Sequence, residues 1–423
     1  MSKQSNIILG IDEKPTWAKG LLLSFQHVFA MFGATILVPI LLGLPVSVAL
    51  FASGAGTLIY QWVTNKKVPV YLGSSFAYIG AMQIAMEQMG GDISAAQTGI
   101  FMAGLGYLVL ALLIKKVGNQ WITRLLPPIV IGPMIMVIGL SLSASAVQNA
   151  GFIVGGDWRM MVAAIMTFII TALINTKAKG FLKIIPFLVG IVGGYIISAC
   201  LGLVDFTPII EAPWLSFPSL IFPFPTHLFD SYTLYFGPEA FAMIPLILVT
   251  GAEHIGDHTV LGQICGTNFL ENPGLEKTLA GDGLATAFSA LIGGPANTTY
   301  GENTGVIGMT GIASVYVIRN AALFAIALSF LGKFTALISS IPTAVLGGIS
   351  ILLYGVIASN GLKVMIEDHT DFGQPRNLII ASAMLVIGLG GAVFDLGWIT
   401  FSGTSLSAIV GILLNLTLPR TEV

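Results

Sequence analysis

Charged residues are scarce in this chain. Asp, Glu, Lys and Arg make up only 9% of its 423 residues, whereas 55% are hydrophobic. Soluble globular proteins carry about 25% charged residues, so the composition excludes that class and indicates an integral membrane protein. The formal net charge is −2, which gives no reason to expect nucleic acid or another polyanion as a partner.

Other features that would point to an enzyme or a secreted protein are also missing. The two cysteines, Cys200 and Cys265, lie far apart without metal or redox spacing, and we expect them to pack as small hydrophobic residues. The sequence has no Walker motif, so ATP is not expected to supply energy. The N-terminus is too polar and acidic for a cleaved signal peptide, so the first apolar run should stay in the mature protein.

Long apolar runs are what the sequence has in quantity. A membrane-spanning helix needs about 20 mostly apolar residues. Twelve runs meet this requirement, and two shorter, Gly-interrupted segments bring the predicted crossings to fourteen in an all-α polytopic membrane protein. The twelve runs are 21–43, 47–64, 96–114, 126–147, 159–176, 181–202, 240–262, 278–293, 316–332, 335–358, 377–394 and 400–418, and the interrupted segments are 68–88 and 296–311.

The basic residues support this count. With the N-terminus in the cytoplasm, sixteen Lys and Arg fall on the cytoplasmic side and only Arg159 and Lys333 fall outside, as the positive-inside rule requires. Both termini are therefore predicted to be cytoplasmic, in the cell (plasma or inner) membrane. The long 203–238 loop has no Lys or Arg and is predicted to face outward. The sixteen are Lys3, Lys14, Lys19, Lys66, Lys67, Lys115, Lys116, Arg124, Lys177, Lys179, Lys183, Lys277, Arg319, Lys363, Arg376 and Arg420.

Fourteen spans divide into two halves of seven, and an odd number makes the halves inverted repeats, as in many transporters. The interrupted segments come third in each half, as VPVYLGSSFAYIGAM (68–82) and ANTTYGENTGVIGMT (296–310). Matched, Gly-interrupted segments of this kind are the best sequence indication of a binding site. The alternative, that Gly and Pro merely kink ordinary spanning helices, stays open.

Each interrupted segment is predicted to enter as an extended strand and continue as a half-helix whose first N–H groups point at the midplane. Such exposed backbone is tolerated only inside the protein, where it lines a cavity. The extended parts, Val68 to Tyr71 and Asn297 to Tyr300, should face each other. The half-helices should begin near Ser74 and Asn303.

Few ionisable residues lie within the spans, and such residues are functional candidates by default. Glu253 and Asp257 are four residues apart and share one helical face, while Glu302 lies in the second interrupted segment. Two carboxylates close together in a low dielectric cannot both ionise cheaply, which suits a group that carries a proton. A purely structural buried pair is the alternative, and it weighs most for Asp282, near a helix end.

Two histidines in the same span allow a rival interpretation. His254 and His258 are four residues apart, as in zinc-binding helices, but a metalloprotease places Glu directly after the first His and this chain has Ile255 there. No third ligand is apparent, so an intramembrane metalloenzyme is a remote alternative. Hydrogen bonding between helices is the better prediction for both rings.

Five stretches together are similar to one known family. SFQHVFAMFGATILVP, YLGSSFAYI, GAEHIGDH, NTTYGENTGVIGMTG and GGISILLYGVI resemble the nucleobase–ascorbate transporter (nucleobase:cation symporter) family over residues 16 to 418. Within it they look closest to the bacterial uracil permeases, a branch of uracil:proton symporters. The most specific motif is Glu-Asn-x-Gly-x-x-x-x-Thr-Gly, which is met by Glu302, Asn303, Gly305, Thr310 and Gly311.

The resemblance implies a division into two domains and a homodimer. Residues 16–117 and 237–333 would form a core domain that binds the substrate. Residues 118–205 and 334–420 would form a gate domain, and residues 206–236 an extracellular or periplasmic loop.

The resemblance also implies roles for particular residues. Glu253 and Glu302 would be the substrate carboxylates. Gly301 and the backbone at Phe76 would meet substrate carbonyls, with the Phe76 ring packed on the nucleobase. Tyr354 would face the site from the gate domain.

Ser75 and Tyr300 complete the substrate-binding set that the resemblance implies. Asp257 occupies a position where some uracil permeases carry a His implicated in proton coupling, so coupling is assigned to Asp257 together with Glu253. No catalytic residue, cofactor or metal ligand is expected. The accessory residues are Asn303, His254, Asp282, which matches an acidic position important in purine-transporting relatives, and His27.

The expected activity is proton-coupled import of uracil by alternating access. Uracil presents N–H donors flanked by carbonyl acceptors, which suits carboxylates, half-helix N–H groups and an aromatic ring. Purine, xanthine and ascorbate transporters share the scaffold and stay open as alternatives. An anion carrier is disfavoured because the predicted site holds carboxylates and no Lys or Arg, and a passive channel because buried titratable carboxylates favour coupled transport.

Overall fold

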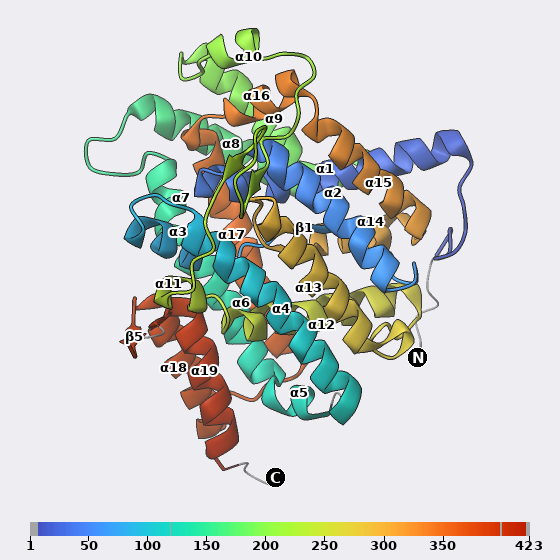
Figure 1. The fold of residues 1–423 in the computed structure, drawn as a ribbon, viewed down its shortest axis with the longest axis vertical. Coiled ribbons are helices and arrows are strands. Elements are labelled where there is room, and N and C mark those ends of the chain that lie inside the picture. The colour runs from blue at the N-terminus through green and yellow to red at the C-terminus, as the bar shows by residue number, and fades with distance from the viewer. Residues whose placement is uncertain (1–6, 119, 398–399, 420–423) are drawn as a thin grey trace.

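The computed structural model describes residues 7–118, 120–397 and 400–419 and is mostly helical (Figure 1). Lys3 and Arg420, two of the residues used to orient the chain, lie outside the described residues. Within the described residues, seven helices or joined helix pairs are long and apolar enough to cross a membrane. They are α1 (Trp17–Leu42), α2 (Val46–Val63), α4 (Ser94–Val117), α6 with α7 (Pro128–Ser141, Ser143–Asn149), α8 (Trp158–Lys177), α11 with α12 (Pro238–Phe241, Leu246–Cys265) and α17 (Thr343–Glu367).

Further helices are shorter. α15 (Val315–Ser329) and α16 (Gly332–Ser339) would add an eighth crossing if taken together, but they meet at a bend of 85°. α9 (Pro186–Cys200), α18 (Pro375–Leu389) and α19 (Gly403–Thr417) are apolar but only 15 residues long, and α13 (Leu275–Leu291) has 17. A multi-pass membrane protein is thus established, whereas fourteen crossings remain a prediction.

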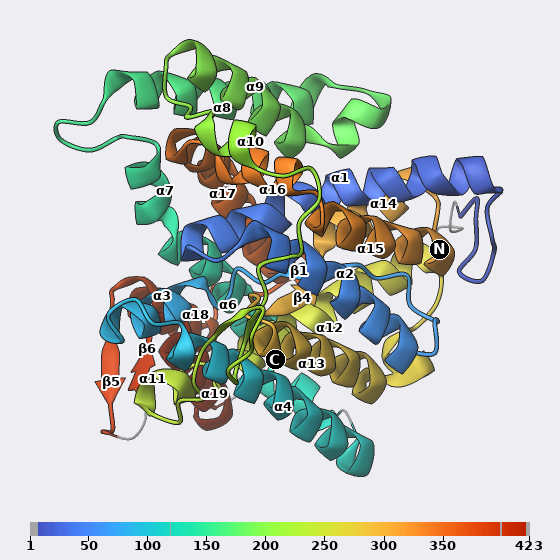
Figure 2. The same ribbon diagram turned by 45° about the horizontal axis from the view of Figure 1, so that its top comes forward.

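One set of packed helices consists of α1, α2, α4, α13 and α15. α4 and α13 lie side by side in Figures 1 and 2. Their backbones approach closely: a Cβ on Gly104 would stand 2.7 Å from the carbonyl oxygen of Gly283, and one on Gly283 would stand 2.7 Å from that of Gly104. Only glycine permits this distance, which is how close helix packing is achieved where the surrounding lipid supplies no hydrophobic drive.

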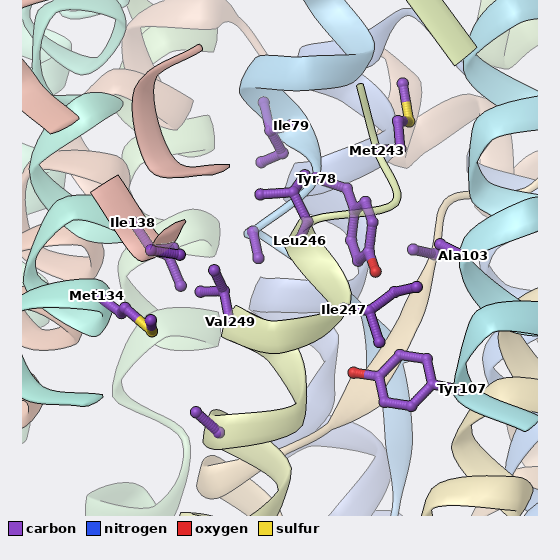
Figure 3. Close-up of a cluster of buried hydrophobic side chains, with 14 of the residues drawn as sticks. Tyr78, Ile79, Ala103, Tyr107, Met134, Ile138, Met243, Leu246, Ile247 and Val249 are labelled. Atoms are coloured by element: carbon purple, nitrogen blue, oxygen red, sulfur yellow. The ribbon is translucent and has the colours of Figure 1, made fainter. Parts of the chain in front are cut away.

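A second set packs α17 against α6, α7, α8 and α9, with α18 and α19 joined to α6. α12 lies between the sets, because it contacts α13 and α14 as well as α6 and α19. Figure 3 shows the apolar cluster at this junction, where Leu246 and Val249 of α12 lie between Tyr107 of α4 and Met134 of α6. The short helix α5 (Gln120–Leu125) joins α4 to α6.

The two interrupted segments meet as predicted. β1 (Leu72–Ser74) pairs antiparallel with β4 (Asn297–Thr299), and Figure 2 shows them between α2 and α13. Each strand leads into a ten-residue helix, α3 (Ile79–Gln88) or α14 (Gly301–Thr310). The reading of these segments as ordinary kinked helices is therefore wrong.

The boundaries in the first interrupted segment were predicted incorrectly. The paired strand begins at Leu72, after the stretch from Val68 to Tyr71, and α3 begins at Ile79 rather than near Ser74. The pairing continues past the strand, because the N–H of Ser75 donates to the carbonyl of Ala296 at 2.8 Å, and a turn must follow before a helix can start. In the second segment α14 begins two residues earlier than predicted, at Gly301.

Three predicted spans also end elsewhere. The 335–358 run is split between α16 and α17, because the chain breaks at Ile341 and Pro342 and α17 then continues to Glu367. The end of 377–394 and the start of 400–418 are not helical. They form the antiparallel pair β5 (Val393–Asp395) and β6 (Thr400–Ser402), after α18 has ended at Gly390.

The long loop before α12 carries little regular structure: α10 (Thr207–Glu211) and the two-residue strands β2 (Ile221–Phe222) and β3 (Asp230–Ser231). Lys333 of α16 donates to the carbonyls of Ile209 and Ile210 at the end of α10. Arg159 pairs with the N-cap residue Asp157 at 2.7 Å, and these hydrogen bonds lower the pKa of the Asp157 carboxyl. Both basic residues predicted to face outward are thus held by local partners.

The cysteines form no disulfide. Cys265 is half-buried at the end of α12, whereas Cys200 is exposed at the end of α9, so the expectation that both pack as small hydrophobic residues is wrong for Cys200.

Candidate transport site

The candidate site is built around one face of α12. Glu253 and Asp257 are both half-buried and lie one helical turn apart. A Cβ added to Gly256, between them, would meet no atom within 4 Å, so this face opens onto free space. Asp282 of α13 lies beside His254 of α12, and Glu302 follows Gly301, which stands beside Asp257. The four predicted intramembrane carboxylates therefore lie on α12 and on two helices that contact it, α13 and α14.

The strand pair brings the start of α14 to Asp257. Thr299, the last residue of β4, donates a hydrogen bond from Oγ1 to Asp257 Oδ2 at 2.6 Å. The other carboxylate oxygen lies 3.8 Å from where a Cβ on Gly301 would stand. Gly301 is exposed and is the first residue of α14. The free N–H groups at this helix end, with the positive end of its dipole, thus stand beside a carboxylate.

Glu302 is half-buried at the first turn of α14. It lines a cavity of about 190 Å³ together with Phe29 of α1, Gly305, and the segment that leads into α9, which contributes Lys183 and Pro186. Lys183 is exposed, so the cavity joins a carboxylate in the interior to a cation at the protein surface.

An aromatic pair links the two sets of helices. Phe76, in the turn between β1 and α3, meets Tyr354 of α17 with 6.1 Å between ring centroids and 76° between ring planes. Phe76 is half-buried, and Tyr354 is 2% exposed. An edge-to-face contact of this kind is a preferred geometry for aromatic pairs. Tyr354, which was predicted to face the site from the gate domain, thus contacts Phe76, and its contact with a substrate stays a prediction.

A buried polar layer lies on the neighbouring face of α12, about 100° around the helix from Glu253 and Asp257. His254 Nδ1 is 2.8 Å from Asp282 Oδ2 of α13. His258 Nδ1 donates to the His254 carbonyl at 2.8 Å, which leaves its Nε2 to the hydroxyl of Tyr60 on α2. The two imidazole rings stack with 3.9 Å between centroids. The histidines therefore make the interhelical hydrogen bonds that the sequence predicted.

The accessory residues His27 and Asn303 are joined directly. The side-chain amide of Asn303 lies 3.1 Å from both Nδ1 and the backbone oxygen of His27, so it binds the first half-turn of α14 to α1. In the described part of the chain, no group of three His, Cys, Asp or Glu side chains is arranged to hold a metal.

Tyr300 is held by contacts within the protein, whereas Ser75 is buried without a side-chain hydrogen bond. The Tyr300 hydroxyl donates to the carbonyl of Ser74 at 3.0 Å, and its ring fills the space beside Gly73. Ser75 is buried, and its hydroxyl has no hydrogen-bond partner among the described residues. Contact of either side chain with a substrate stays a prediction.

Sequence reasoning missed the residues that fix the strands. In α2, Thr57 Oγ1 accepts from the N–H of Leu72, and Ser53 donates to its carbonyl. The side chain of Asn297 donates to the carbonyls of Ala52 and Ala285, so it binds β4 to both α2 and α13. Small polar residues spaced at four in an apolar helix were the available signal for Ser53 and Thr57. For Asn297 and Thr299, the sequence offered only their polarity within an otherwise apolar region as an indication of a structural role.

The two short helices α3 and α14 each follow one of two paired strands, and carboxylates lie where these segments meet. This arrangement is typical of membrane transporters. A model of the Permease family (Xan_ur_permease) matches residues 18–396, and the chain belongs to this family. It is thus a transporter rather than an enzyme.

Curated relatives are similar over nearly their whole length. The chain is 49% identical to a uracil permease of Bacillus caldolyticus over 97% of this chain and 95% of the relative. It is 46% identical to a uracil permease of Bacillus subtilis (strain 168) over 100% and 97%. A uracil permease of Escherichia coli (strain K12) is 39% identical over 96% and 93%.

Solved structures share the fold. The transmembrane domain of the cyanobacterial bicarbonate transporter BicA aligns with a TM-score of 0.63 at 16% identity, covering 96% of this chain and 100% of that one. Murine Slc26a9, an anion transporter solved in the inward-facing state, aligns with a TM-score of 0.71 at 12% identity, covering 95% and 68%. At these identities the likeness concerns the fold alone.

Proposed function

We propose that this permease imports uracil across the cell membrane by proton-coupled alternating access. Its relatives named uracil permease match it at 39 to 49% identity over at least 96% of its length. The structural neighbours transport anions, but here the carboxylate of Asp257 stands beside the start of α14. This charge disfavours an anionic substrate.

The observation that carries the proposal is the pairing of β1 with β4, which sets Gly301 beside Asp257. Uracil is neutral and planar, with N–H donors flanked by carbonyl acceptors. The carboxylates of Glu253 and Glu302 would accept from the N–H groups, and the free N–H groups of α14 would donate to a carbonyl. Phe76 would cover the ring, with Tyr354 behind it.

We propose that residues 16–117 and 237–333 form a core domain, residues 118–205 and 334–420 a gate domain, and residues 206–236 an outer loop. The separate packing of α1, α2, α4, α13 and α15 from α6, α8, α9 and α17 supports this division. We further propose fourteen segments in two inverted repeats. The support is the equivalent place of β1–α3 and β4–α14, each a strand followed by a ten-residue helix.

The exposed positions suggest the side from which the site is reached. Gly301, Gly305 and Gly355 are exposed, and the cavity at Glu302 reaches Lys183, a residue assigned to the cytoplasm by the charge pattern. We therefore propose a conformation open to the cytoplasm, with both termini on that side. A homodimer is proposed on the family resemblance, and chemical cross-linking in native membranes tests it.

The decisive experiment uses the purified chain in proteoliposomes. Labelled uracil should accumulate under an inward proton gradient, and a protonophore should abolish the accumulation. Unlabelled uracil should compete, whereas xanthine, adenine and ascorbate should not. Competition by xanthine or adenine would instead identify a purine transporter of the same family. Uracil equilibration that ignores the protonophore would identify a passive channel.

A further inference from the structure

Thr299 makes the most direct contact with the proposed proton carrier. Its hydroxyl donates to Asp257 Oδ2 at 2.6 Å, within the range of a charge-assisted O–H···O⁻ bond. Thr299 is 2% exposed, on a strand of three residues. No ion pair among the described residues involves Asp257. The neutral hydroxyl of Thr299 therefore favours the ionised carboxylate by a direct hydrogen bond, in addition to the N-terminal end of α14 beside it.

The charged and titratable groups around Asp257 all act in the opposite sense. Glu253 lies one turn away on the same helix, Glu302 is the second residue of α14, and Asp282 lies on α13. Each carries negative charge when ionised and so favours the protonated form of Asp257. The hydrogen bond from Thr299 thus favours the ionised form of Asp257, whereas the three neighbouring carboxyl groups favour the protonated form.

We propose that Thr299 is a positioning residue that stays hydrogen-bonded to Asp257 in both protonation states. Through this bond, protonation of Asp257 affects the strand that leads into α14. The inference rests on the proposed proton coupling. A hydroxyl is both a donor and an acceptor. Thr299 donates to the ionised carboxylate, and when Asp257 takes up a proton its O–H can donate to Thr299 Oγ1. The contact persists while the direction of the bond reverses.

Strand β4 connects Thr299 directly to the helix that is proposed to bind the substrate. Thr299 pairs with Leu72, and the next residue, Tyr300, donates its N–H to the carbonyl of Tyr71 at 3.1 Å. Gly301 then begins α14. Only Tyr300 separates the group bonded to Asp257 from the first N–H groups of the half-helix. A proton bound at Asp257 therefore changes a bond on the segment that is proposed to bind the substrate carbonyl.

The matched control is the neighbouring threonine. Thr298 is 4% exposed and its hydroxyl has no hydrogen-bond partner among the described residues. Thr298→Val and Thr299→Val thus make the same change at adjacent buried positions on one strand, and only the second removes a donor to a carboxylate. Thr299→Ser keeps the hydroxyl and serves as the rescue variant.

The experiment is an infrared pH titration of the purified protein without substrate. The carboxylic acid band of Asp257 is identified as the band lost in Asp257→Asn. In Thr299→Val this band should persist to higher pH, because the ionised form has lost a donor. The bond lost from the ionised form is stronger than the neutral bond lost from the protonated form, and this difference predicts a displacement of about one pH unit. Thr298→Val and Thr299→Ser should titrate like the unaltered protein.

Uracil binding measured against pH in the same variants gives the second readout. Thr299→Val should displace the profile in the same direction, and Thr299→Val in the Asp257→Asn background should displace nothing further. An unmoved Asp257 band in folded Thr299→Val overturns the proposal. So does an equal displacement in Thr298→Val. If Thr299→Val does not fold, Thr299→Ala replaces it under the same criteria. A protein that does not bind uracil at any pH refutes the proposed function, while the infrared result still decides the role of Thr299.

Discussion

The ring of Phe76 stands edge-on to the ring of Tyr354, with 6.1 Å between their centroids. The contact joins the turn after β1 to α17, so it bridges the two sets of helices between which a substrate is proposed to bind. Any relative movement of the sets must change this contact. It is therefore a suitable place to begin testing the site.

Tyr354→Ala is expected to weaken uracil binding about two- to twelvefold, because an aromatic pair contributes about 0.5–1.5 kcal/mol beyond the area it buries. Tyr354→Phe keeps the ring and should bind nearly as the unaltered protein does. Isothermal titration calorimetry in detergent measures both. A Tyr354→Phe variant as weak as Tyr354→Ala would assign the effect to the hydroxyl.

Glu302→Gln and Glu253→Gln should each weaken uracil binding at least tenfold. An amide oxygen accepts a weaker hydrogen bond than a carboxylate and brings a competing donor with it. Equilibrium binding of labelled uracil to purified protein tests this. Glu367→Gln, at an exposed end of α17, is the control and should bind normally. A variant at position 302 or 253 with unaltered affinity would remove that residue from the site.

Asp257→Asn should abolish proton-driven accumulation of uracil but leave the exchange of uracil across the membrane. The amide cannot take up and release a proton, so accumulation driven by a pH gradient should be lost while uracil counterflow continues. Both are measured in the same vesicles. Persistence of gradient-driven accumulation would mean that the proton is carried elsewhere, with Glu253 as the next candidate.

The buried pair of His254 and Asp282 should matter for stability. Removing one partner from such a pair leaves the other without compensation, at a cost of about 3–5 kcal/mol if the pair is charged. Asp282→Ala should therefore lower the melting temperature clearly, and Asp282→Asn less so because it can still hydrogen-bond. Glu367→Ala breaks the exposed pair with Lys363 and should have little effect. Equal melting temperatures for Asp282→Ala and Glu367→Ala would contradict the structural role.

A cysteine at Gly301, in a background without Cys200 and Cys265, should react with a small polar thiol reagent. The position is exposed at the start of α14, and uracil should slow the reaction. Ile379→Cys is the control, since Ile379 is exposed on an apolar helix where lipid excludes the reagent. A Gly301→Cys variant that is as unreactive as Ile379→Cys would place the α14 terminus outside any aqueous cavity.

Several features of the site were predictable because their signal is local. Glu253 and Asp257 share a face through helical spacing alone, and charge at membrane depth marks them as functional. The interrupted segments were found because Gly and small polar residues break two apolar runs at equivalent places. The pairing of the two segments followed from the need to satisfy their backbone groups away from water.

Other features depended on contacts between distant parts of the chain. The strand starts at Leu72 because Ser53 and Thr57 of α2 bind that residue, and no pattern within residues 68–82 records this. The hydrogen bond from the Tyr300 hydroxyl to the carbonyl of Ser74 joins the two segments and could not be read from either one alone.

The sequence by itself determined the class of protein, the two interrupted segments and the carboxylates that must lie inside, because composition, periodicity and charge placement are properties of the chain read in order. The tertiary structure alone decided which neighbour each carboxylate has. Asp257 is bonded to Thr299, 42 positions away, and His254 to Asp282, 28 positions away. These partners are set by how α12, α13 and β4 pack together, and packing joins residues whose separation along the chain carries no signal.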